Sequence, residues 1–554
     1  MRRFHLLSAV ATGVLLALAW PAVGGAVPLI FLAWVPLLVA EERFSRADKG
    51  QRPRHFMPFV MLALLVWNLC TTWWLFEVSE PMGTRLFTLI GPNLGNVAVM
   101  SLPWLVMRGV HRYWGGARAR WAFVVCWIAF EKAHMNWDLS WPWLTLGNVF
   151  AEHPQWVQWY EWTGTFGGSL WVLALNVMIA GWIIRCLGSN VREQGSRRPA
   201  MIAAVLLVPL IGSWVRYATF KEEGVPVEVV VVQPNIDPYT EKFGSMDPLV
   251  QVDRMLAQAE AVITPNTALV LMPETALQEG TRLDHQQGRW HLEGLWENDL
   301  GASRSVDRIR RFLQAHPGTA VLTGMSSDRF YGEGEPMPRS ARPIGDSGTG
   351  FVSYNAALLV GSDGSTESYH KSKLVPGVEL MPFEVLLGQL DGLALDLGGT
   401  TGSLGIQDER EVMSTADGRV KAAPVICYES IYGDHVAAHV RNGATLITIM
   451  TNDAWWGDSP GYKHHLAYGR LRAVETRRDV ARSANTGISC SIDQRGDVHD
   501  ATAWWTPAAF RTTLHARTDL TFFVRSGDLI GTAAQGLVLL LLCALVLRLI
   551  KRRA

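Results

Sequence analysis

The hydrophobic pattern of the chain changes near residue 220. Before this point, long apolar runs follow one another, separated by basic or aromatic stretches. After it, short β-branched runs alternate with polar and helical stretches, until a last long apolar run at Leu529–Ile550. Long apolar runs are typical of membrane helices, and short runs bounded by turn residues are typical of buried strands. The pattern therefore predicts a helical membrane region, an α/β domain and a C-terminal membrane helix.

The long apolar runs predict eight membrane-spanning helices. They are Leu6–Ala22, Ala26–Ala40, Phe56–Phe76, Leu86–Met107, Trp121–Phe130, Phe166–Ile184, Met201–Val215 and Leu529–Ile550. Several are shorter than the roughly 20 residues that a bilayer requires, so we expect their ends to extend into flanking residues. The run Trp121–Phe130 is the shortest, and whether it spans fully stays open. Glu131 follows it, and a carboxylate at a membrane boundary is costly unless paired or hydrated, which makes Glu131 a candidate site residue.

Basic residues predict the orientation of these helices. They gather before the first run, in alternate loops and after the last run, as Arg2, Arg3, Arg43, Arg46, Lys49, Arg52, Arg54, Arg108, Arg112, Arg118, Arg120, Arg185, Arg192, Arg197, Arg198, Lys551, Arg552 and Arg553. With eight spans every basic loop is cytoplasmic, which places Arg216–Asp528 outside the cytoplasmic membrane. Without Trp121–Phe130 the alternation would fail. A cleaved signal peptide at the first run is the alternative, but no clear cleavage motif precedes the second run.

These observations predict the domain boundaries. We expect a membrane domain at 1–218 with seven helices and a Trp-rich loop near 134–163, an extracytoplasmic catalytic domain at 226–510, a membrane helix at 528–550 and a basic cytoplasmic tail at 551–554. With 554 residues, of which 49% are hydrophobic, the chain is long enough for both parts. The totals of 50 Lys+Arg and 50 Asp+Glu give no indication of nucleic-acid binding.

The loop near 134–163 is dense in tryptophan. It contains Trp137, Trp141, Trp143, Trp156, Trp159 and Trp162. Indole rings are enriched at membrane interfaces, so we favour an interfacial aromatic belt over direct lipid binding by this loop.

Six short apolar runs after Val227 predict layered sheets. They are V-E-V-V-V-V-Q-P-N-I, A-L-V-L-M-P-E-T, T-A-V-L-T-G-M, Y-N-A-A-L-L-V-G-S, A-P-V-I-C-Y-E and A-T-L-I-T-I-M-T-N-D. Helical stretches such as Leu249–Ile263 lie between them, and this alternation indicates sheets covered by helices. The stretches Gly280–Gly301 and Tyr331–Gly350 are expected to be surface excursions, either mobile lids or insertions.

Three residues suited to acyl transfer stand at the ends of such runs or just outside them. Cys427 ends A-P-V-I-C, Glu274 ends V-L-M-P-E, and Lys371 belongs to Y-H-K-S-K. Acyl transfer needs a nucleophile, a base and a positive group where the oxyanion develops. A thiol with its usual pKa of about 8.5 is mostly protonated, so a carboxylate and an ammonium would both favour attack. Each residue alone also has an ordinary explanation, as a packed cysteine, a helix-capping glutamate and a solvated lysine.

The order Glu, Lys, Cys at strand ends resembles the nitrilase-type carbon–nitrogen hydrolase superfamily. Together with the membrane segments, the chain resembles the apolipoprotein N-acyltransferase family over nearly its whole length. This resemblance implies a membrane region of about eight helices plus a four-layer αββα sandwich. It implies that Glu274 is the general base, that Lys371 stabilises the tetrahedral intermediate and that Cys427 becomes acylated. Through P-W-L-T-L-G and E-W-T-G, it also implies that the Trp-rich loop forms the floor of the active site.

The resemblance implies further site residues. Glu379 and Glu429 resemble glutamates that organise the lysine and its loops. Phe243 stands where an aromatic lid residue of the family falls, although core packing is an equal alternative. The lysine motif ends P-G-V-E, whereas well-known members have P-F-G-E, which leaves the conformation of this loop open. The candidate set is completed by Tyr428, Asn452 and Trp455.

No metal or other cofactor is expected. His464 and His465 are adjacent and lack the i, i+4 spacing that places two ligands on one face of a helix. Cys427 and Cys490 must stay unpaired for the thiol to react, and Cys490 is expected to be a core residue. A group of arginines after the histidines is expected to form either a solvated face or contacts with anionic headgroups: Arg470, Arg472, Arg477, Arg478 and Arg482.

The expected function is two-step acyl transfer in the bacterial inner membrane. By the resemblance, a phospholipid, with phosphatidylethanolamine as the analogue, acylates Cys427 as a thioester. The α-amine of a diacylglyceryl-cysteine apolipoprotein then takes the chain. One alternative is a membrane-anchored amidase or nitrilase for a small substrate, which would need only one anchor. Another is a multispan transporter or lipid-binding scaffold with a catalytically dead domain, which the intact Glu, Lys and Cys set disfavours.

Overall fold

The computed structural model describes residues 2–48, 50, 53–188, 197–286, 289–383 and 403–553. Lys49, Arg52 and Arg192, three of the basic residues used to predict the orientation, lie outside the described residues. The chain divides into two compact units. Unit 1 comprises Met1–Phe220, Ser459–Leu471 and Ser526–Ala554, and unit 2 comprises Lys221–Asp458 and Arg472–Arg525.

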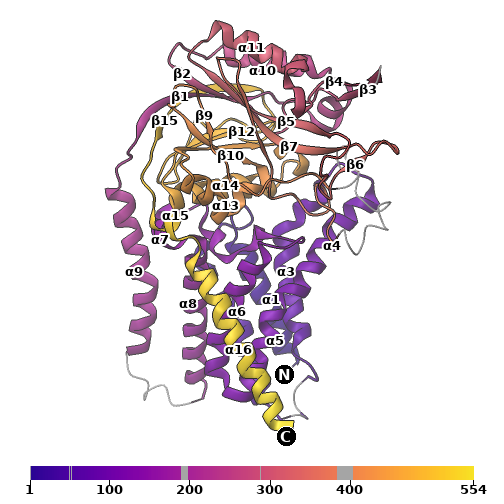
Figure 1. The fold of residues 1–554 in the computed structure, drawn as a ribbon. Coiled ribbons are helices and arrows are strands. Elements are labelled where there is room, and N and C mark those ends of the chain that lie inside the picture. The colour runs from indigo at the N-terminus through magenta and orange to yellow at the C-terminus, as the bar shows by residue number, and fades with distance from the viewer. Residues whose placement is uncertain are drawn as a thin grey trace. The chain divides into compact units, whose positions relative to one another are not determined.

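Unit 1 is helical. Its α-helices are α1 (Arg2–Ala19), α2 (Val35–Arg46), α3 (Met57–Thr72), α4 (Met82–Met100), α5 (Leu102–Trp114), α6 (Gly116–His134), α7 (Tyr160–Thr163), α8 (Thr165–Cys186), α9 (Arg197–Thr219) and α16 (Leu529–Arg553), and α14 (Pro460–Thr476) is shared with unit 2. Short helical turns are η1 (Val27–Phe31), η2 (Trp73–Glu77), η3 (Pro142–Leu144), η4 (Leu146–Phe150) and η5 (Pro154–Trp156). Helix α1 packs against α3, and α6 packs against α5 and α16 (Figure 1).

Six helical segments of the described chain are long and apolar enough to cross a membrane. They are Arg2–Ala19, Met57–Glu77, Met82–Trp114, Thr165–Cys186, Arg197–Thr219 and Leu529–Lys551. The two other predicted spans are helical but differ from these. The run Ala26–Ala40 forms η1 and then α2, each with a proline in its first turn, where the missing N–H costs no hydrogen bond. The run Trp121–Phe130 lies inside α6, whose ends carry charged residues. The count of eight spans stays a prediction.

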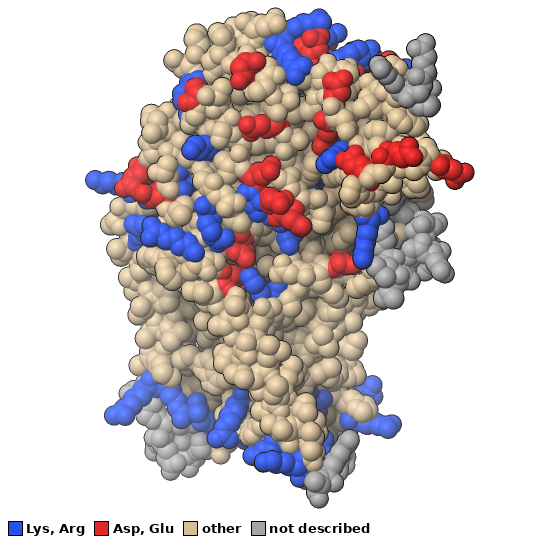
Figure 2. All heavy atoms as spheres, viewed as in Figure 1, with Lys and Arg blue, Asp and Glu red and all other residues tan. Residues whose placement is uncertain are grey.

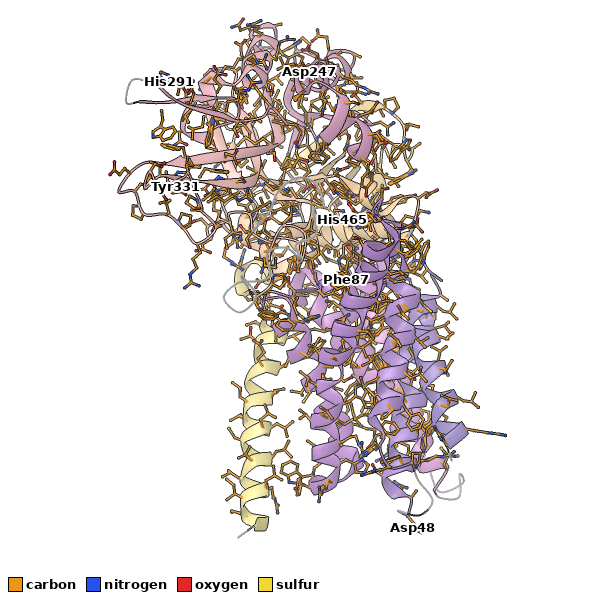
Figure 3. The ribbon with its side chains drawn as sticks, turned by 90° about the vertical axis from the view of Figure 1, so that its right-hand side faces the viewer. Asp48, Phe87, Asp247, His291, Tyr331 and His465 are labelled. Carbon is orange, nitrogen blue, oxygen red and sulfur yellow. The ribbon has the colours of Figure 1, made fainter. Side chains whose placement is uncertain are left out.

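The outer surface of unit 1 is apolar. Leu540 on α16 and Val208 on α9 are 69% and 68% exposed. Figure 2 shows a broad uncharged band over these helices, and Lys and Arg side chains gather at the end of unit 1 that holds both chain termini. Asp48 lies at this basic end, and Phe87 lies toward the other end of the helices (Figure 3). A continuous apolar exterior of this kind is stable in lipid rather than in water.

Unit 1 buries the Trp-rich loop only in part. Trp162 and Trp137 are 50% and 37% exposed, which suits a membrane interface, whereas Trp143 is buried and its ring lies 5.9 Å from that of Tyr468. His464 faces the carbonyl oxygen of Pro21, with Nε2 2.6 Å away. The aromatic-belt interpretation therefore fits the exposed tryptophans and is wrong for Trp143. The assignment of this loop to the floor of an active site stays a prediction.

Glu131 is buried in unit 1. Its Oε1 accepts hydrogen bonds from Trp127 Nε1 at 2.9 Å and from the backbone N–H of Leu146 at 2.8 Å. Since Leu146 begins η4, the carboxylate ties this turn to α6. These donors satisfy Oε1, as burial of a polar atom requires, and the candidate role of Glu131 as a site residue stays a prediction.

Unit 2 is built on two sheets. The first has the order β15-β1-β2-β5-β7-β6, with β8 paired to β7, and the second has the order β14-β13-β12-β11-β10-β9. The first contains β1 (Val225–Gln233), β2 (Thr267–Leu271), β5 (Ala320–Tyr331), β6 (Arg342–Pro343), β7 (Gly350–Val360), β8 (Thr366–His370) and β15 (Ala508–Ala516). The second contains β9 (Met413–Ser414), β10 (Lys421–Ile426), β11 (Leu446–Thr451), β12 (Val480–Ala484), β13 (Cys490–Ile492) and β14 (Val498–His499). A separate hairpin is formed by β3 (Arg282–Gln286) and β4 (Arg289–Glu293).

The two faces of the first sheet are both buried. Val230 on β1 packs in one cluster with Met255, whereas the neighbouring Val231 packs with Met450 of the second sheet. Helices α10 (Pro248–Glu260) and α11 (Arg304–Ala315) cover the outer face of the first sheet, and α13 (Gly433–Arg441) packs on the second (Figure 1). The four-layer αββα sandwich and its strand runs are thereby confirmed.

The remaining helical pieces of unit 2 lie between strands or after the last strand. They are η7 (Pro238–Ser245), η8 (Glu297–Ala302), η10 (Cys427–Ile431), η11 (Asp453–Trp456) and α15 (Phe522–Ser526). The predicted excursion at 280–301 contains the hairpin and most of η8, and the choice between a lid and an insertion stays a prediction.

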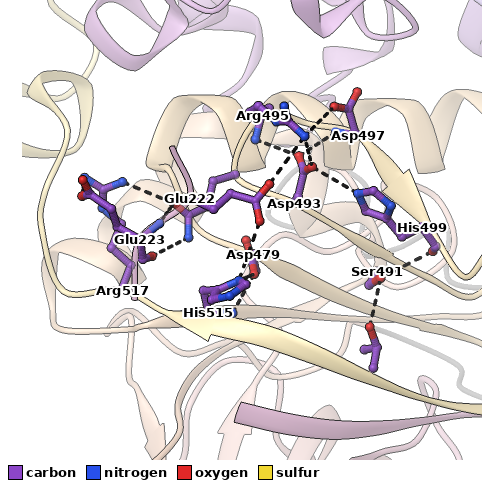
Figure 4. Close-up of polar contacts among 12 residues, drawn as sticks. Glu222, Glu223, Asp479, Ser491, Asp493, Arg495, Asp497, His499, His515 and Arg517 are labelled. Atoms are coloured by element: carbon purple, nitrogen blue, oxygen red, sulfur yellow. Dashed lines mark hydrogen bonds and ion pairs between the residues drawn. The ribbon is translucent and has the colours of Figure 1, made fainter. Parts of the chain in front are cut away.

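Ion pairs fix the first residues of unit 2 (Figure 4). Glu223 lies 3.1 Å from Arg517, and Glu222 lies 3.6 Å from Arg495, which also contacts Asp493 at 3.3 Å. These contacts join the segment before β1 to the chain around β13 and β15.

The arginines after His465 are mostly internal. Arg472, Arg477, Arg478 and Arg482 are all buried, so both a solvated face and headgroup contacts are wrong for these four. Arg482 Nη2 donates to both carboxylate oxygens of Asp453, at 3.1 and 2.9 Å, and Arg472 pairs with Glu475. A buried guanidinium is stable only when carboxylates or carbonyls accept its hydrogen bonds, as they do here.

Candidate active site

Glu274 is placed by a tight turn after β2. The neighbouring Thr275 has a φ of 46°, in the left-handed region that is unfavourable for a β-branched residue. The turn lies so close to β5 that a Cβ on Gly324 would be 2.4 Å from the Thr275 nitrogen and 2.6 Å from the Glu274 Cα. Glu274 is 5% exposed, and its turn leads to β3 rather than to a helix, so the helix-cap explanation is wrong.

Lys371 lies directly after β8 and contacts the predicted base. Its backbone N–H donates to the carbonyl of Asn355 at 2.9 Å, and its Nζ donates to Glu274 Oε1 at 3.1 Å and to Glu379 Oε1 at 2.8 Å. The residue is 1% exposed, so the solvated-lysine explanation is wrong. Burial alone lowers the pKa of Lys371, but the carboxylates of Glu274 and Glu379 raise it well above its ordinary value. The ammonium is therefore charged.

Asn355, which the sequence analysis did not single out, connects Glu379 to Glu274. Asn355 on β7 donates from Nδ2 to Glu274 Oε1 at 2.8 Å and to Glu379 Oε1 at 2.9 Å. Glu379 Oε2 accepts a hydrogen bond from the N–H of Val375 at 2.8 Å. Gly377, which lies between these two residues in the sequence, has a φ of 80°. The P-G-V-E ending therefore still delivers its glutamate to the lysine, with the glycine supplying the left-handed turn.

Cys427 stands directly after the carboxyl end of β10, which lies between β9 and β11 in the second sheet. Ile426 pairs with Met450 of β11, and Cys427 itself has a φ of 48°. A non-glycine residue in this region is strained, and such strain gathers at functional positions. The thiol is 6% exposed. Burial and the negative charge of Glu274 raise its pKa, while Lys371 and a hydrogen bond with Thr451 lower it, with a net rise. The thiol is thus protonated at rest and within electrostatic reach of both partners.

Glu429 connects the cysteine turn to the lysine turn. Its Oε2 accepts from the N–H of Ile426 at 2.9 Å, and its Oε1 accepts from the N–H of Ser372 at 2.7 Å and from Tyr369 Oη at 2.9 Å. Burial alone raises the pKa of Glu429, but His435 and the two backbone donors lower it to about 2. Tyr428 is buried with its ring 5.3 Å from that of Tyr432, and so supports this turn by packing.

Three further candidates lie around η7 and β11. The Asn452 backbone N–H donates to Glu274 Oε2 at 3.1 Å, so Asn452 contacts the predicted base directly. The ring of Phe243 is stacked on Trp455 with centroids 6.0 Å apart. Phe243 is 41% exposed, which makes core packing the wrong explanation for it.

The two cysteines of unit 2 are not joined in a disulfide. Cys490 is fully buried in β13, which confirms its prediction as a core residue. In the described residues, one group of three side chains could offer metal ligands together, namely Glu41, Glu42 and His111 in unit 1. Arg120 lies 2.6 Å from Glu42 there, so a guanidinium already balances this carboxylate.

Sequence reasoning missed Asn355, Thr451 and Lys242. Asn355 interrupts the apolar run Y-N-A-A-L-L-V, and a lone amide inside a buried strand is a signal that could have identified it. Thr451 and Lys242 carry no such signal, because their contacts join segments distant in the sequence.

Comparisons with known proteins agree over nearly the whole chain. Residues 228–520 match the carbon-nitrogen hydrolase family, and residues 12–178 match the apolipoprotein N-acyltransferase N-terminal domain. The chain is similar to an apolipoprotein N-acyltransferase of Chlorobaculum tepidum, with 31% identity over 95% of this chain and 93% of the relative. The relative of the same name from Geobacter metallireducens is 26% identical over 96% and 93% of the two chains. An amidase structure from Nesterenkonia sp. covers 55% of this chain and 94% of its own, with 16% identity and a TM-score of 0.35. The chain belongs to the apolipoprotein N-acyltransferase family.

Proposed function

We propose that this protein transfers an acyl chain from a membrane phospholipid, through a thioester on Cys427, to the N-terminal α-amine of a diacylglyceryl-cysteine apolipoprotein. The observation that carries the proposal is the position of Lys371 Nζ, which is hydrogen-bonded to Glu274 and Glu379 and whose charge acts on the Cys427 thiol. Family membership supports the acceptor and the membrane setting.

In the first step, the Glu274 carboxylate accepts the proton of the Cys427 thiol as the sulfur attacks the ester carbonyl of the phospholipid. The ammonium of Lys371 stabilises the oxyanion that develops, which a buried cation does far better than one in water. Collapse of the intermediate breaks the ester bond, and the lysophospholipid oxygen takes the proton from Glu274. The products are a Cys427 thioester and a lysophospholipid.

In the second step, the neutral α-amine of the acceptor attacks the thioester carbonyl. Glu274 receives the proton that the amine loses, the carbon–sulfur bond breaks, and the proton returns to Cys427. The products are an amide and the free enzyme. Because water competes with the amine, a buried thiol of 6% exposure favours transfer over hydrolysis.

The remaining candidates support these groups. Glu379 and Asn452 position Lys371 and Glu274, and Glu429 and Tyr428 hold the cysteine turn. Phe243 and Trp455 form an aromatic pair beside the base, suited to contact with acyl chains.

We further propose that the enzyme lies in the bacterial inner membrane with both termini in the cytoplasm. Domain 1–218 and helix 528–550 would span the membrane, and domain 226–510 would face the periplasm. The basic end and apolar exterior of unit 1 support this orientation. Phosphatidylethanolamine is the proposed donor.

The test is a two-stage transfer assay with purified protein. Phospholipid with a labelled acyl chain is added first, and a synthetic diacylated lipopeptide is added second. We expect label on the protein after the first stage and on the lipopeptide amine after the second. Cys427→Ala should abolish both, and Cys490→Ala should leave both intact. Release of labelled fatty acid alone would contradict acyl transfer and favour a hydrolase.

A further inference from the structure

Lys242 is a buried lysine beside the predicted base that the proposed mechanism does not use. It belongs to η7 and is 4% exposed. Its Nζ donates to the carbonyl oxygen of Glu274 at 2.9 Å and to Thr275 Oγ1 at 2.8 Å. Both of these acceptors are uncharged, whereas Lys371 lies against two carboxylates. Burial lowers the pKa of Lys242 to about 7, although the charge of Glu274 raises it. A lysine kept in such an unfavourable place is a candidate functional group.

The turn that Lys242 contacts is strained and held from two sides. On one side, β5 holds it through the Gly324 N–H, which donates to the Pro273 carbonyl at 3.0 Å. On the other side, Lys242 binds the peptide of Glu274 and the side chain of Thr275, the residue with left-handed φ. Because the Cα of Glu274 belongs to this turn, the position of its carboxylate depends on both contacts.

Lys242 is itself firmly placed in η7. Its N–H donates to the Asp237 carbonyl at 2.8 Å, and its own carbonyl accepts from Gln251 Nε2 of α10 at 3.1 Å. The next residue is Phe243, which stacks on Trp455. The lysine is therefore a short, fixed connection between the segment that carries Phe243 and the turn that carries Glu274.

We propose that Lys242 is a positioning residue, which fixes the Glu274 turn for proton exchange with Cys427 and couples it to the placement of Phe243. This inference rests on the proposed role of Glu274 as the base. A base that is misplaced by about 1 Å can cost on the order of 10²-fold in rate, so loss of one such contact is measurable.

The test compares Lys242→Met, which removes both hydrogen bonds, with Lys421→Met at an exposed lysine of the same unit. Two rates are measured, the acylation of Cys427 by phospholipid and its alkylation by iodoacetamide, which needs no acyl donor. We expect Lys242→Met to lower both rates about 10- to 100-fold, with the KM for phospholipid within about twofold of wild type. Lys421→Met should match wild type.

Two further variants test the contact without removing the lysine. Thr275→Val keeps the shape of the side chain but loses the acceptor hydroxyl, and Thr275→Ser keeps the hydroxyl. We expect about a 3- to 10-fold loss for Thr275→Val and less than twofold for Thr275→Ser, since one net hydrogen bond is involved. If Lys242→Met does not fold, the two Thr275 variants still test whether the hydrogen bond from Lys242 positions the Glu274 turn.

The decisive comparison is made in the Glu274→Gln chain. A residue that acts through Glu274 has nothing left to position there, so adding Lys242→Met should cause no further loss. An equal fold-loss in both backgrounds, or a raised KM with unchanged kcat, would overturn the inference. If the wild type forms no acyl-enzyme but alkylation still depends on Lys242 through Glu274, the proposed acyl transfer fails and the inference stands.

Discussion

The two units differ in how far they expose apolar side chains. On α16 of unit 1, Leu540 is 69% exposed, whereas all five residues of β2 in unit 2 are buried. Unit 1 in turn buries polar side chains such as Asn176, which is fully enclosed and bonded to the Ile30 carbonyl. The two units are therefore built for different solvents. An exposed position in one unit and an exposed position in the other therefore carry different costs for the same substitution.

The units also differ in how they bury charge. In unit 1, Glu42 is balanced by Arg120 and Arg46 at 2.6 and 2.7 Å. In unit 2, Lys371 bonds two carboxylates and its charge also acts on a protonated thiol. Ions that only neutralise each other take no part in proton transfer. An ion cluster beside a protonated thiol can move a proton.

The largest expected effect is the loss of the base from this cluster. Glu274→Gln keeps the size of the side chain but cannot accept the thiol proton, so the rate of Cys427 acylation should fall by about 10²- to 10⁴-fold. Single-turnover kinetics with labelled phospholipid measure this. Glu333→Gln, at an exposed glutamate of unit 2, is the control and should leave the rate unchanged. A wild-type rate for Glu274→Gln would remove the distinction between the two kinds of buried charge.

A matched pair of surface substitutions tests the two solvents. Leu540→Arg on α16 should cost about 2.5–3.5 kcal/mol of membrane insertion, because a guanidinium near the middle of a bilayer loses its hydration. Val250→Arg on α10 starts from a comparably exposed position, 53% against 69%, and should be neutral within about 0.5 kcal/mol. The amount of protein in the membrane fraction and its melting temperature report the effect. Equal behaviour of the two variants would contradict a lipid-facing α16.

The pH dependence of stability tests the cysteine turn. The pKa of Glu429 is about 2 when folded, below its ordinary 4.5, so its stabilising contribution is present above about pH 4.5 and is lost as the pH falls through about 2. At pH 7, Glu429→Gln should lower the free energy of unfolding by at most about 3 kcal/mol, which is measured as a lower melting temperature. The difference in melting temperature between Glu429→Gln and wild type should become smaller toward pH 3. A difference in melting temperature that does not change with pH would mean that Glu429 is not held as a carboxylate anion.

The smallest expected effect is at the aromatic pair. Phe243→Leu removes the stacking on Trp455, which is worth about 0.5–1.5 kcal/mol, so acylation should slow by about 3- to 10-fold. Phe243→Trp should retain most of the rate because it keeps an aromatic face. Full activity of Phe243→Leu in the kinetic assay would mean that the aromatic ring of Phe243 does not contribute to acylation.

The fold was predictable to the extent that it depends on local pattern. The β-branched runs that become β1, β2, β10 and β11 are short and bounded by turns, so their burial follows from composition. The segment Ala26–Ala40 shows the limit, because two prolines divide it into η1 and α2 although its hydropathy suggests one helix.

The site was predictable only where chemistry and motif coincide. Glu274, Lys371 and Cys427 were identified by residue type, strand ends and resemblance, and the structure places the first two in direct contact. Asn355 was missed although its amide inside a buried strand is a signal, and Lys242 was missed because its partner lies 32 positions away in the sequence. The buried arginines were misread for the same reason, since the carboxylate and carbonyl groups that accept their hydrogen bonds cannot be seen in a run of basic letters.

The most direct test of the account is the mass of the peptide that contains Cys427, measured after incubation with phospholipid and before any acceptor is added. We expect one acyl chain on this peptide, removable by hydroxylamine, absent in Cys427→Ala and greatly reduced in Glu274→Gln. An unmodified Cys427 peptide from protein that still acylates the lipopeptide once acceptor is added, or an acyl chain on another residue, would contradict acyl transfer through Cys427.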